Sequence, residues 1–192
     1  DRVGAILAAW LPGAEGGTAV AAALVGDVSP SGRLPMSFPR HVGQVPVYHG
    51  HKPSGGRSHW KGDYVDMPTA PLYPFGHGLS YARFAYADLR VEPDRPDAED
   101  EVTVSFVLRN EGAMAAEEVA QLYLHDPVAS VTRPVRLLAG FARVALEPGQ
   151  SRRVAFCVPV PLLAFYDRAM RFVVEPGEIL VGVGASSADI RL

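Results

Sequence analysis

Hydrophobic residues follow two different patterns along this chain. Residues 3–10 form one continuous apolar run, whereas beyond residue 86 apolar and polar residues alternate within short segments. A continuous run of this length is typical of a parallel strand that is buried on both faces. Alternation is typical of strands that bury only one face. The pattern therefore predicts an α/β element followed by an all-β unit.

A turn and a helix are expected directly after the first apolar run. Proline and glycine residues between positions 12 and 17 break that run, as such residues commonly do. Residues 18–25 are rich in Ala, which favours a helix, and Gly26 stands where a helix commonly ends. A parallel strand needs neighbouring strands and covering helices, and residues 1–45 do not supply them. We therefore expect residues 1–45 to be the C-terminal piece of an α/β sandwich domain that other protein must complete.

Seven strands are expected in the second half of the chain. Turn signals, such as the Glu-Pro-Gly sequences at 147–149 and 175–177, separate runs of strand length. These runs comprise residues 84–91, 102–108, 119–125, 136–146, 154–158, 171–174 and 179–183. Such spacing is typical of an immunoglobulin-like or fibronectin type III-like β-sandwich, which we expect over residues 86–192. Alternation within the runs places the core at Phe106, Leu122, Leu124, Phe141, Phe156 and Val181.

Residues 46–85 have no sustained periodicity and are rich in Gly, Pro, His, Tyr and Lys. A long irregular segment in a compact protein is usually functional or wraps another surface, so we expect a wrapping linker here. Trp60 and Tyr64 could form the aromatic platform of a sugar site. The same segment offers polar side chains for hydrogen bonding: His51, Lys52, Arg57, His59, Asp63 and Asp66. Packing of the two aromatic residues in a seam between domains is the simpler interpretation, and a place at the rim of a substrate site is the alternative.

Charge and composition exclude several classes of partner and site. A formal net charge of −3 gives no electrostatic footprint for nucleic acid or for an anionic membrane. No apolar run approaches the roughly 20 residues of a membrane-spanning helix. The single cysteine, Cys157, excludes a disulfide within the chain, and its place in an alternating apolar run predicts a buried structural thiol. The histidines do not indicate a metal site, and no motif indicates a cofactor.

Five motifs resemble the C-terminal part of glycoside hydrolase family 3, and they occur here in the same order as in that family. They are PGAEGG at 12–17, GDVSPSGRLPMSFPR at 26–40, PLYPFGHGLSY at 71–81, VAQLYLHDP at 119–127 and LLAGFARVALEPGQ at 137–150. The type that the chain resembles is the bacterial β-glucosidase with a fibronectin type III-like domain, and the resemblance covers essentially all residues. Prolines, glycines and aromatic residues within 71–81 predict a segment that packs between the α/β layer and the β-sandwich.

The resemblance implies a retaining hydrolase of terminal non-reducing β-D-glucosyl residues. Its members carry a (β/α)8 barrel, then an α/β sandwich and, in many cases, the fibronectin-like domain. One carboxylate of a retaining glycosidase attacks the anomeric carbon, and a second acts first as acid and then as base. The family places the first on the barrel and the second in an earlier loop of the α/β sandwich. The resemblance thus implies no catalytic residue in this chain, which alone should be inactive.

Glu15 is a further candidate for the rim of a substrate site. It follows a predicted strand, at the end of the sheet where open α/β folds bind ligands. It also lies at the start of the predicted helix, whose dipole stabilises a charged carboxylate. A general acid must instead hold a proton at working pH. We therefore expect Glu15 to cap the helix, with a substrate-side role as the alternative.

Two functions remain open at this point. The first is the C-terminal portion of a β-glucosidase, which would use a β-glucoside or oligosaccharide substrate and need the upstream barrel and α/β sandwich. The second is a free-standing, non-catalytic β-sandwich module that binds carbohydrate or protein. Arg133 and Arg136 flank Pro134 and could bind an acidic partner, although a solvated loop is the simpler interpretation.

Overall fold

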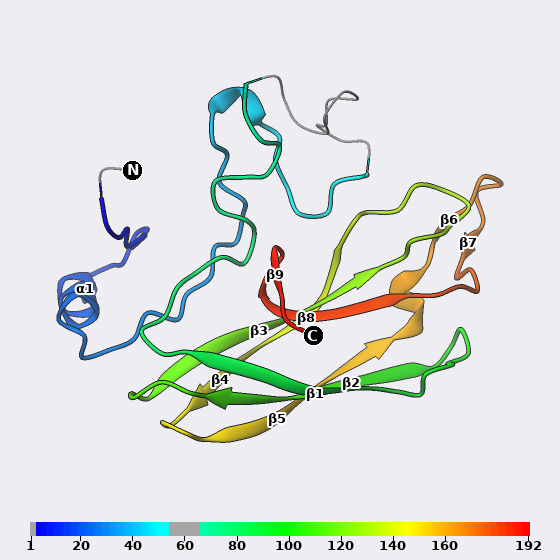
Figure 1. Cartoon of the computed structure of the whole chain (residues 1–192). Helices are drawn as coiled ribbons and strands as arrows, with labels where there is room; N and C mark the ends of the chain where they lie inside the picture. Colours follow the sequence, from blue (N-terminus) through cyan, green and yellow to red (C-terminus); the bar gives the residue numbers. More distant parts are fainter. Residues whose placement is uncertain (1–2, 54–65) are drawn as a thin grey trace.

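Two antiparallel sheets form the main body of the molecule, which a computed structural model describes over residues 3–53 and 66–192 (Figure 1). The three-stranded sheet has the order β1 (Phe84–Glu92), β2 (Glu101–Asn110), β5 (Ser151–Pro159). The four-stranded sheet has the order β4 (Leu137–Leu146), β3 (Ala116–His125), β8 (Leu180–Ser186), β9 (Asp189–Ile190). A separate ribbon pairs β6 (Phe165–Tyr166) with β7 (Phe172–Val173).

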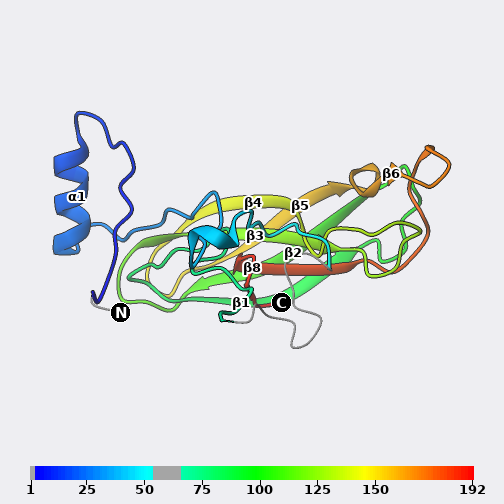
Figure 2. The same ribbon diagram turned by 90° about the horizontal axis from the view of Figure 1, so that it is seen from above.

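One α-helix, α1 (Gly16–Val25), precedes the sandwich in the described part of the chain, together with the short 3-10 turn η1 (Val42–Gln44). A second 3-10 turn, η2 (Val160–Leu163), follows β5. The molecule is elongated, with α1 at one end and β6 at the other (Figure 2). An α/β remnant followed by a fibronectin-like sandwich, the expected fold class, is confirmed.

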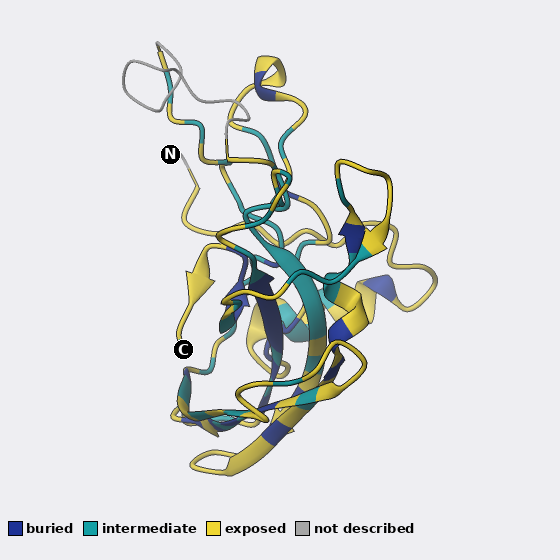
Figure 3. Cartoon of the chain, turned by 90° about the vertical axis from the view of Figure 1, so that its right-hand side faces the viewer, coloured by how far each residue is buried: buried dark blue, intermediate teal, exposed yellow. Residues whose placement is uncertain are grey.

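The core lies between the two sheets, where Phe106, Leu108, Leu122 and Val183 have no exposed surface (Figure 3). Of the six expected core residues, Phe106, Leu122 and Leu124 are buried as predicted. Phe156 and Val181 are half-buried and pack against the core. Inward and outward positions alternate along β2, as expected for sheets that cover each other on one side. In β3, by contrast, residues 120–124 are all buried.

Phe141 was expected in the core, and this prediction is wrong because its side chain is 68% exposed. The register between β3 and β4 shifts between Leu122, which faces Gly140, and Tyr123, which faces Leu138. The extra residue in β4 is a β-bulge, and a shift of one residue moves every later side chain to the other face. Val144 therefore points into the core, whereas Phe141 points outward.

The predicted strand at 171–174 does not join the sandwich. It shortens to β7 and pairs only with β6, because the Asp167 carboxylate accepts the backbone N–H groups of Ala169 and Arg171 and closes a tight turn. The fourth strand of the larger sheet is instead β9, which the hydrophobic pattern does not show because it is two residues long.

Residues 3–10 do not form the predicted buried strand. The segment has no strand partner in the described part of the chain, and Val3, Ile6 and Trp10 are each at least 60% exposed. A strand needs a neighbour to accept its backbone hydrogen bonds, and the residues that the structure describes place none beside the segment. The helix that follows agrees with expectation: Gly26 has a φ of 88°, and its N–H bonds the carbonyls of Ala22 and Ala23.

Cys157 is exposed on β5, so the prediction of a buried thiol is also wrong. Its neighbours Val154, Phe156 and Val158 point toward the core. Side chains in a strand alternate between the two faces, so the odd-numbered Cys157 faces solvent.

We expect a maleimide reagent to modify Cys157 rapidly in the folded chain, because its side chain is accessible without unfolding. Intact-mass spectrometry should show one added group per chain in the absence of denaturant, and none in Cys157→Ser. A label that enters only above the urea midpoint would contradict the exposed position.

Candidate functional site

Two irregular segments, residues 27–53 and 66–83, run side by side between α1 and the sandwich; we call them together the strap. Phe38 and Tyr73 form an antiparallel bridge, and the Leu34 N–H donates to the His77 carbonyl at 2.8 Å. The Gly76 N–H donates in turn to the Leu34 carbonyl at 2.8 Å. The two arms therefore support each other through backbone hydrogen bonds over positions far apart in the sequence (Figure 1).

Gln121 of β3 holds the strap against the four-stranded sheet. Its buried side-chain amide donates to the carbonyls of Gly76, at 3.2 Å, and Ala185, at 2.7 Å. Its carbonyl oxygen accepts a 2.5 Å hydrogen bond from the Tyr123 hydroxyl. Gly76 has a φ of 78°, and a Cβ at this position would collide with the Gln121 side chain. The close approach of strap and sheet thus requires glycine at position 76.

A buried ion pair joins the first arm of the strap to β3. The guanidinium of Arg33 contacts the carboxylate of Glu118, and the two side chains are only 7% and 3% exposed. A more exposed network lies beside it, in which Ser31 and Arg143 both hydrogen-bond Glu117. The strap is therefore docked by buried polar groups as well as by apolar packing.

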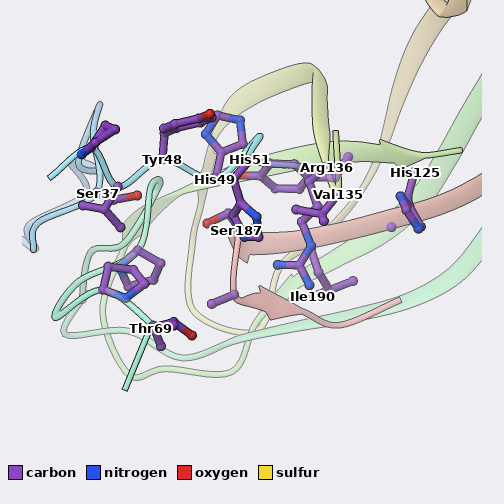
Figure 4. A pocket seen from close by; sticks show the side chains of 18 of the residues that line it. Ser37, Tyr48, His49, His51, Thr69, His125, Val135, Arg136, Ser187 and Ile190 are labelled. Atoms are coloured by element: carbon purple, nitrogen blue, oxygen red, sulfur yellow. The ribbon is translucent and has the colours of Figure 1, made fainter. Parts of the chain in front are cut away.

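A cavity of about 860 Å³ lies between the strap and the outer face of the four-stranded sheet. Residues 44–51 and 69–74 of the strap form one wall, and residues of β3, β8 and β9 form the other. Figure 4 shows Tyr48, His49 and His51 near Arg136 and Val135, with His125 farther along the cavity. This volume falls in the range of sites that bind small molecules.

Aromatic packing holds His49 in the wall of the cavity. Its ring stacks on Phe75 with centroids 4.1 Å apart and meets Tyr123 edge-on at 6.1 Å. Burial lowers the pKa of His49, and the nearby charges of Arg136 and His51 lower it further. Burial also raises the pKa of the Tyr123 phenol, which therefore stays protonated. The wall of the cavity thus combines aromatic rings with the guanidinium of Arg136.

The residues singled out from the sequence do not meet in this cavity. Glu15 occupies the N-cap position of α1, but it is exposed and its side chain makes no capping hydrogen bond, so the expectation that it caps the helix is wrong for its side chain. Trp60 and Tyr64 lie outside the described residues. Arg133, which together with Arg136 suggested an acidic partner, is turned toward Asp126 at 3.7 Å and lies over the Phe165 ring. Arg136 alone of the two lines the cavity.

Sequence reasoning did not identify the cavity because its walls come from six separate segments of the chain: Ser37 and residues 44–51, 69–74, 123–125, 135–136 and 180–190. The only local signal was the basic character around Pro134 and the histidines near Gly50. Within residues 3–53 and 66–192, no group of three His, Cys, Asp or Glu side chains could hold a metal ion. In that same part, no helix has the length and apolar character to cross a membrane.

Two family models match the chain. The model described as Glycosyl hydrolase family 3 C-terminal domain matches residues 1–81, and the model described as Fibronectin type III-like domain matches residues 118–187. Together they cover the strap, much of the sandwich and the segment that contains α1.

Curated relatives carry glycosidase names. A periplasmic β-glucosidase from Salmonella typhimurium is 40% identical over the whole of this chain, which covers 26% of that protein. A putative β-xylosidase from Formosa agariphila is 38% identical over the whole chain, again covering 25% of the relative. The chain thus spans about a quarter of the length of the curated relatives that it matches.

Solved structures show the same arrangement. A β-glucosidase from Listeria innocua, crystallised in complex with glucose, superposes with a TM-score of 0.87 at 37% identity, over 94% of this chain and 26% of that one. A β-glucosidase from Erythrobacter marinus gives a TM-score of 0.87 at 41% identity, over 95% of this chain and 24% of its own. The likeness extends beyond the sandwich, because it covers nearly all residues of the chain.

Proposed function

This chain belongs to glycoside hydrolase family 3, and from that membership we propose that it is the C-terminal portion of a retaining β-glucosidase. The intact enzyme would hydrolyse terminal non-reducing β-D-glucosyl residues. The observation that carries the proposal is the superposition of nearly the whole chain on the Listeria β-glucosidase, whose structures were determined with glucose and with isofagomine. We keep the division into residues 1–45, 46–85 and 86–192 as part of this proposal.

Exposed apolar surface supports the idea that other protein completes the α/β part. Ile6, Trp10 and Leu11 are 70%, 60% and 98% exposed, and Leu24 and Val25 of α1 are also largely exposed. Monomeric proteins rarely leave so many large apolar side chains together in water. We propose that upstream strands and helices of the same α/β sandwich cover these side chains. We also propose that the barrel precedes the α/β sandwich in the same polypeptide.

The pKa shifts of the carboxyl groups support the idea that this chain lacks the catalytic carboxylates. A retaining glycosidase needs one carboxyl with a raised pKa as its acid and another as its nucleophile. In the described part of the chain, the shifted carboxyls have lowered pKa values: hydrogen bonds from Arg90 and Arg153 lower that of Asp88, and a hydrogen bond from Arg191 lowers that of Asp189. We propose that both catalytic carboxylates lie upstream.

We expect the intact enzyme to hydrolyse an aryl β-glucoside and the 192-residue chain alone to show no turnover above buffer. The reason is that loss of the two carboxylates removes most of the rate enhancement of a glycosidase. The measurement is release of the aryl group, with proton NMR to identify the first anomer of glucose formed. β-Glucose as the first product would support retention.

The Glu15→Gln variant of the intact enzyme serves as a control and should keep its activity, since we propose that both catalytic carboxylates lie upstream of this chain. Hydrolysis by the isolated chain that is abolished by Glu15→Gln would overturn the proposal.

Trp60 and Tyr64 remain candidates for the substrate rim. If they contact the substrate there, their replacement by Ala should raise KM more than it lowers kcat. If no barrel precedes the chain in its open reading frame, the free-standing binding module becomes the better explanation.

A further inference from the structure

The cavity between the strap and the four-stranded sheet has a charge imbalance. Its lining contains Arg136 and the imidazoles of His49, His51 and His125, but no Asp or Glu among the described residues. A buried cation in a protein is ordinarily paired with an anion. Among the described residues, the lining therefore offers the positive charge of Arg136 and further hydrogen-bonding groups without a carboxylate that would balance the charge.

Arg136 differs in this respect from most arginines of the chain. In the described part, eight others form an ion pair with a carboxylate: Arg33, Arg83, Arg90, Arg133, Arg143, Arg153, Arg171 and Arg191. Arg136 forms no ion pair with any described residue, although it is half-buried and its charge acts on both His49 and Tyr123. A guanidinium presents a planar fork of N–H donors that matches a carboxylate.

A second polar group in the cavity also lacks a partner. The Nδ1 atom of His125 is buried and has no hydrogen bond in the described structure. Buried polar atoms in proteins are almost always hydrogen-bonded, so an unpaired one indicates a group that binds there. Figure 4 shows His125 at some distance from His49 and His51 along the cavity. A ligand that contacts both Arg136 and His125 would need a polar group at each of its two ends.

The remaining walls are apolar and aromatic. Tyr48 and Tyr123 contribute rings, and Pro46, Pro71, Pro74 and Ile190 contribute aliphatic surface. Apolar and aromatic walls with a few polar groups are typical of sites that bind small organic molecules, and the tyrosine rings offer flat faces on which a ring can pack. We therefore propose that this cavity binds a small organic acid whose carboxylate is carried on a six-membered ring, with Arg136 as the group that binds the carboxylate.

Two kinds of ring-bearing acid fit this proposal. The ring can be a sugar, as in a hexuronate, or an aromatic ring, as in a benzoate. Hydroxyl groups of a sugar acid could also satisfy His125, whereas an aromatic acid would depend on Tyr48 and Tyr123. Binding of an acid in the cavity does not depend on hydrolysis. The binding proposal can therefore fail while the proposed glycosidase activity is confirmed, and the glycosidase proposal can fail while acid binding is confirmed.

The test is isothermal titration calorimetry on the intact protein that contains this chain, with isofagomine present in excess to occupy the glycosidase site. D-Glucuronate and benzoate are the two probes, and D-glucose and benzamide are their uncharged counterparts. We expect saturable binding of at least one acid and none of its uncharged counterpart. Arg136→Gln should weaken that binding about tenfold or more, because a hydrogen-bonded charge pair is lost.

Arg83→Gln is the matched control, since Arg83 is 86% exposed and is not part of the cavity lining. It should bind the acid within twofold of the unmodified protein. Arg136→Lys keeps the charge but not the planar fork, so it should lose less affinity than Arg136→Gln. Hydrogen exchange gives a readout that needs no variant: the bound acid should slow exchange in residues 44–51 and 135–137, but not in residues 165–173.

Several results would overturn the proposal. They are equal binding of acids and uncharged counterparts, unchanged affinity in Arg136→Gln, no heat with either acid, or acid binding without protection of residues 44–51. If another part of the intact enzyme fills this cavity, neither acid should give a heat of binding.

Discussion

Replacing Phe106 by Ala should lower the free energy of unfolding of the sandwich by about 3–5 kcal/mol. Phe106 has no exposed surface, stacks on Tyr86 with centroids 5.7 Å apart, and meets Phe156 at 6.2 Å. Removal of the ring leaves a cavity between the sheets that neighbouring side chains fill only in part. Urea denaturation of the 192-residue chain, followed by circular dichroism, should show the loss as a lower midpoint with a similar slope.

Phe141→Ala is the matched control because it removes the same ring from the outward face of β4. Its effect should stay within about 0.5 kcal/mol, as for most surface substitutions. Equal destabilisation by the two variants would show that Phe141 is buried in solution, either because the bulge at Leu138–Gly140 is absent or because another surface covers it. A small effect of Phe106→Ala would contradict the assignment of the core.

Replacing Arg33 by Met should destabilise the chain by about 3–5 kcal/mol, because it leaves the Glu118 carboxylate buried without a partner. The expected result is earlier unfolding in urea and faster hydrogen exchange of the strap amides at Leu34 and Gly76, which bond across its two arms. The double variant Arg33→Met, Glu118→Leu should recover much of the loss, since an apolar pair of similar volume can replace a buried ion pair.

The comparison variant for this prediction is Arg90→Met. Arg90 pairs with Asp88 on the surface, and both side chains are largely exposed. Exposed ion pairs contribute about 0–1 kcal/mol. If Arg33→Met cost no more than Arg90→Met, the Arg33–Glu118 pair would have to be solvated, and the strap would not dock on β3 as the structure has it.

Local pattern was sufficient for most of the sandwich. Alternation identified the strands that became β2, β3, β5 and β8, and turn signals placed their ends correctly within a few residues. Phe106, Leu122 and Leu124 were identified as core residues because their strands are regular along their whole length. The same rule also places Cys157 outward, once Val154 and Val158 are taken as the inward positions.

The bulge in β4 shows where the pattern stops being informative. Leu137 and Ala139 pack against the core, and continued alternation would bring Phe141 there too. Val144 and Leu146 are buried as well, and these belong to the other alternation. Both registers are present in one run, so only pairing with β3 decides where the change occurs.

The candidate site was hardly predictable. Its walls join residues 44–51 and 69–74 to β3, β8 and β9, and no repeat or motif relates these segments. The sequence indicated a long irregular segment that wraps another surface and basic residues near Pro134. It did not show that Arg136 lines a cavity while Arg133 pairs with Asp126.

Local sequence was enough to predict the helix and its glycine end, most of the strands, the turns and the family, because each depends on neighbouring residues or on motifs that lie together along the chain. Long-range contacts are needed to explain which face Phe141 occupies, why residues 3–10 have no strand partner among the described residues, and why Arg33 meets Glu118. These depend on contacts between residues up to 85 positions apart in the case of the ion pair. Side-chain periodicity describes one strand or helix at a time, so it contains no information on which distant groups share a buried space.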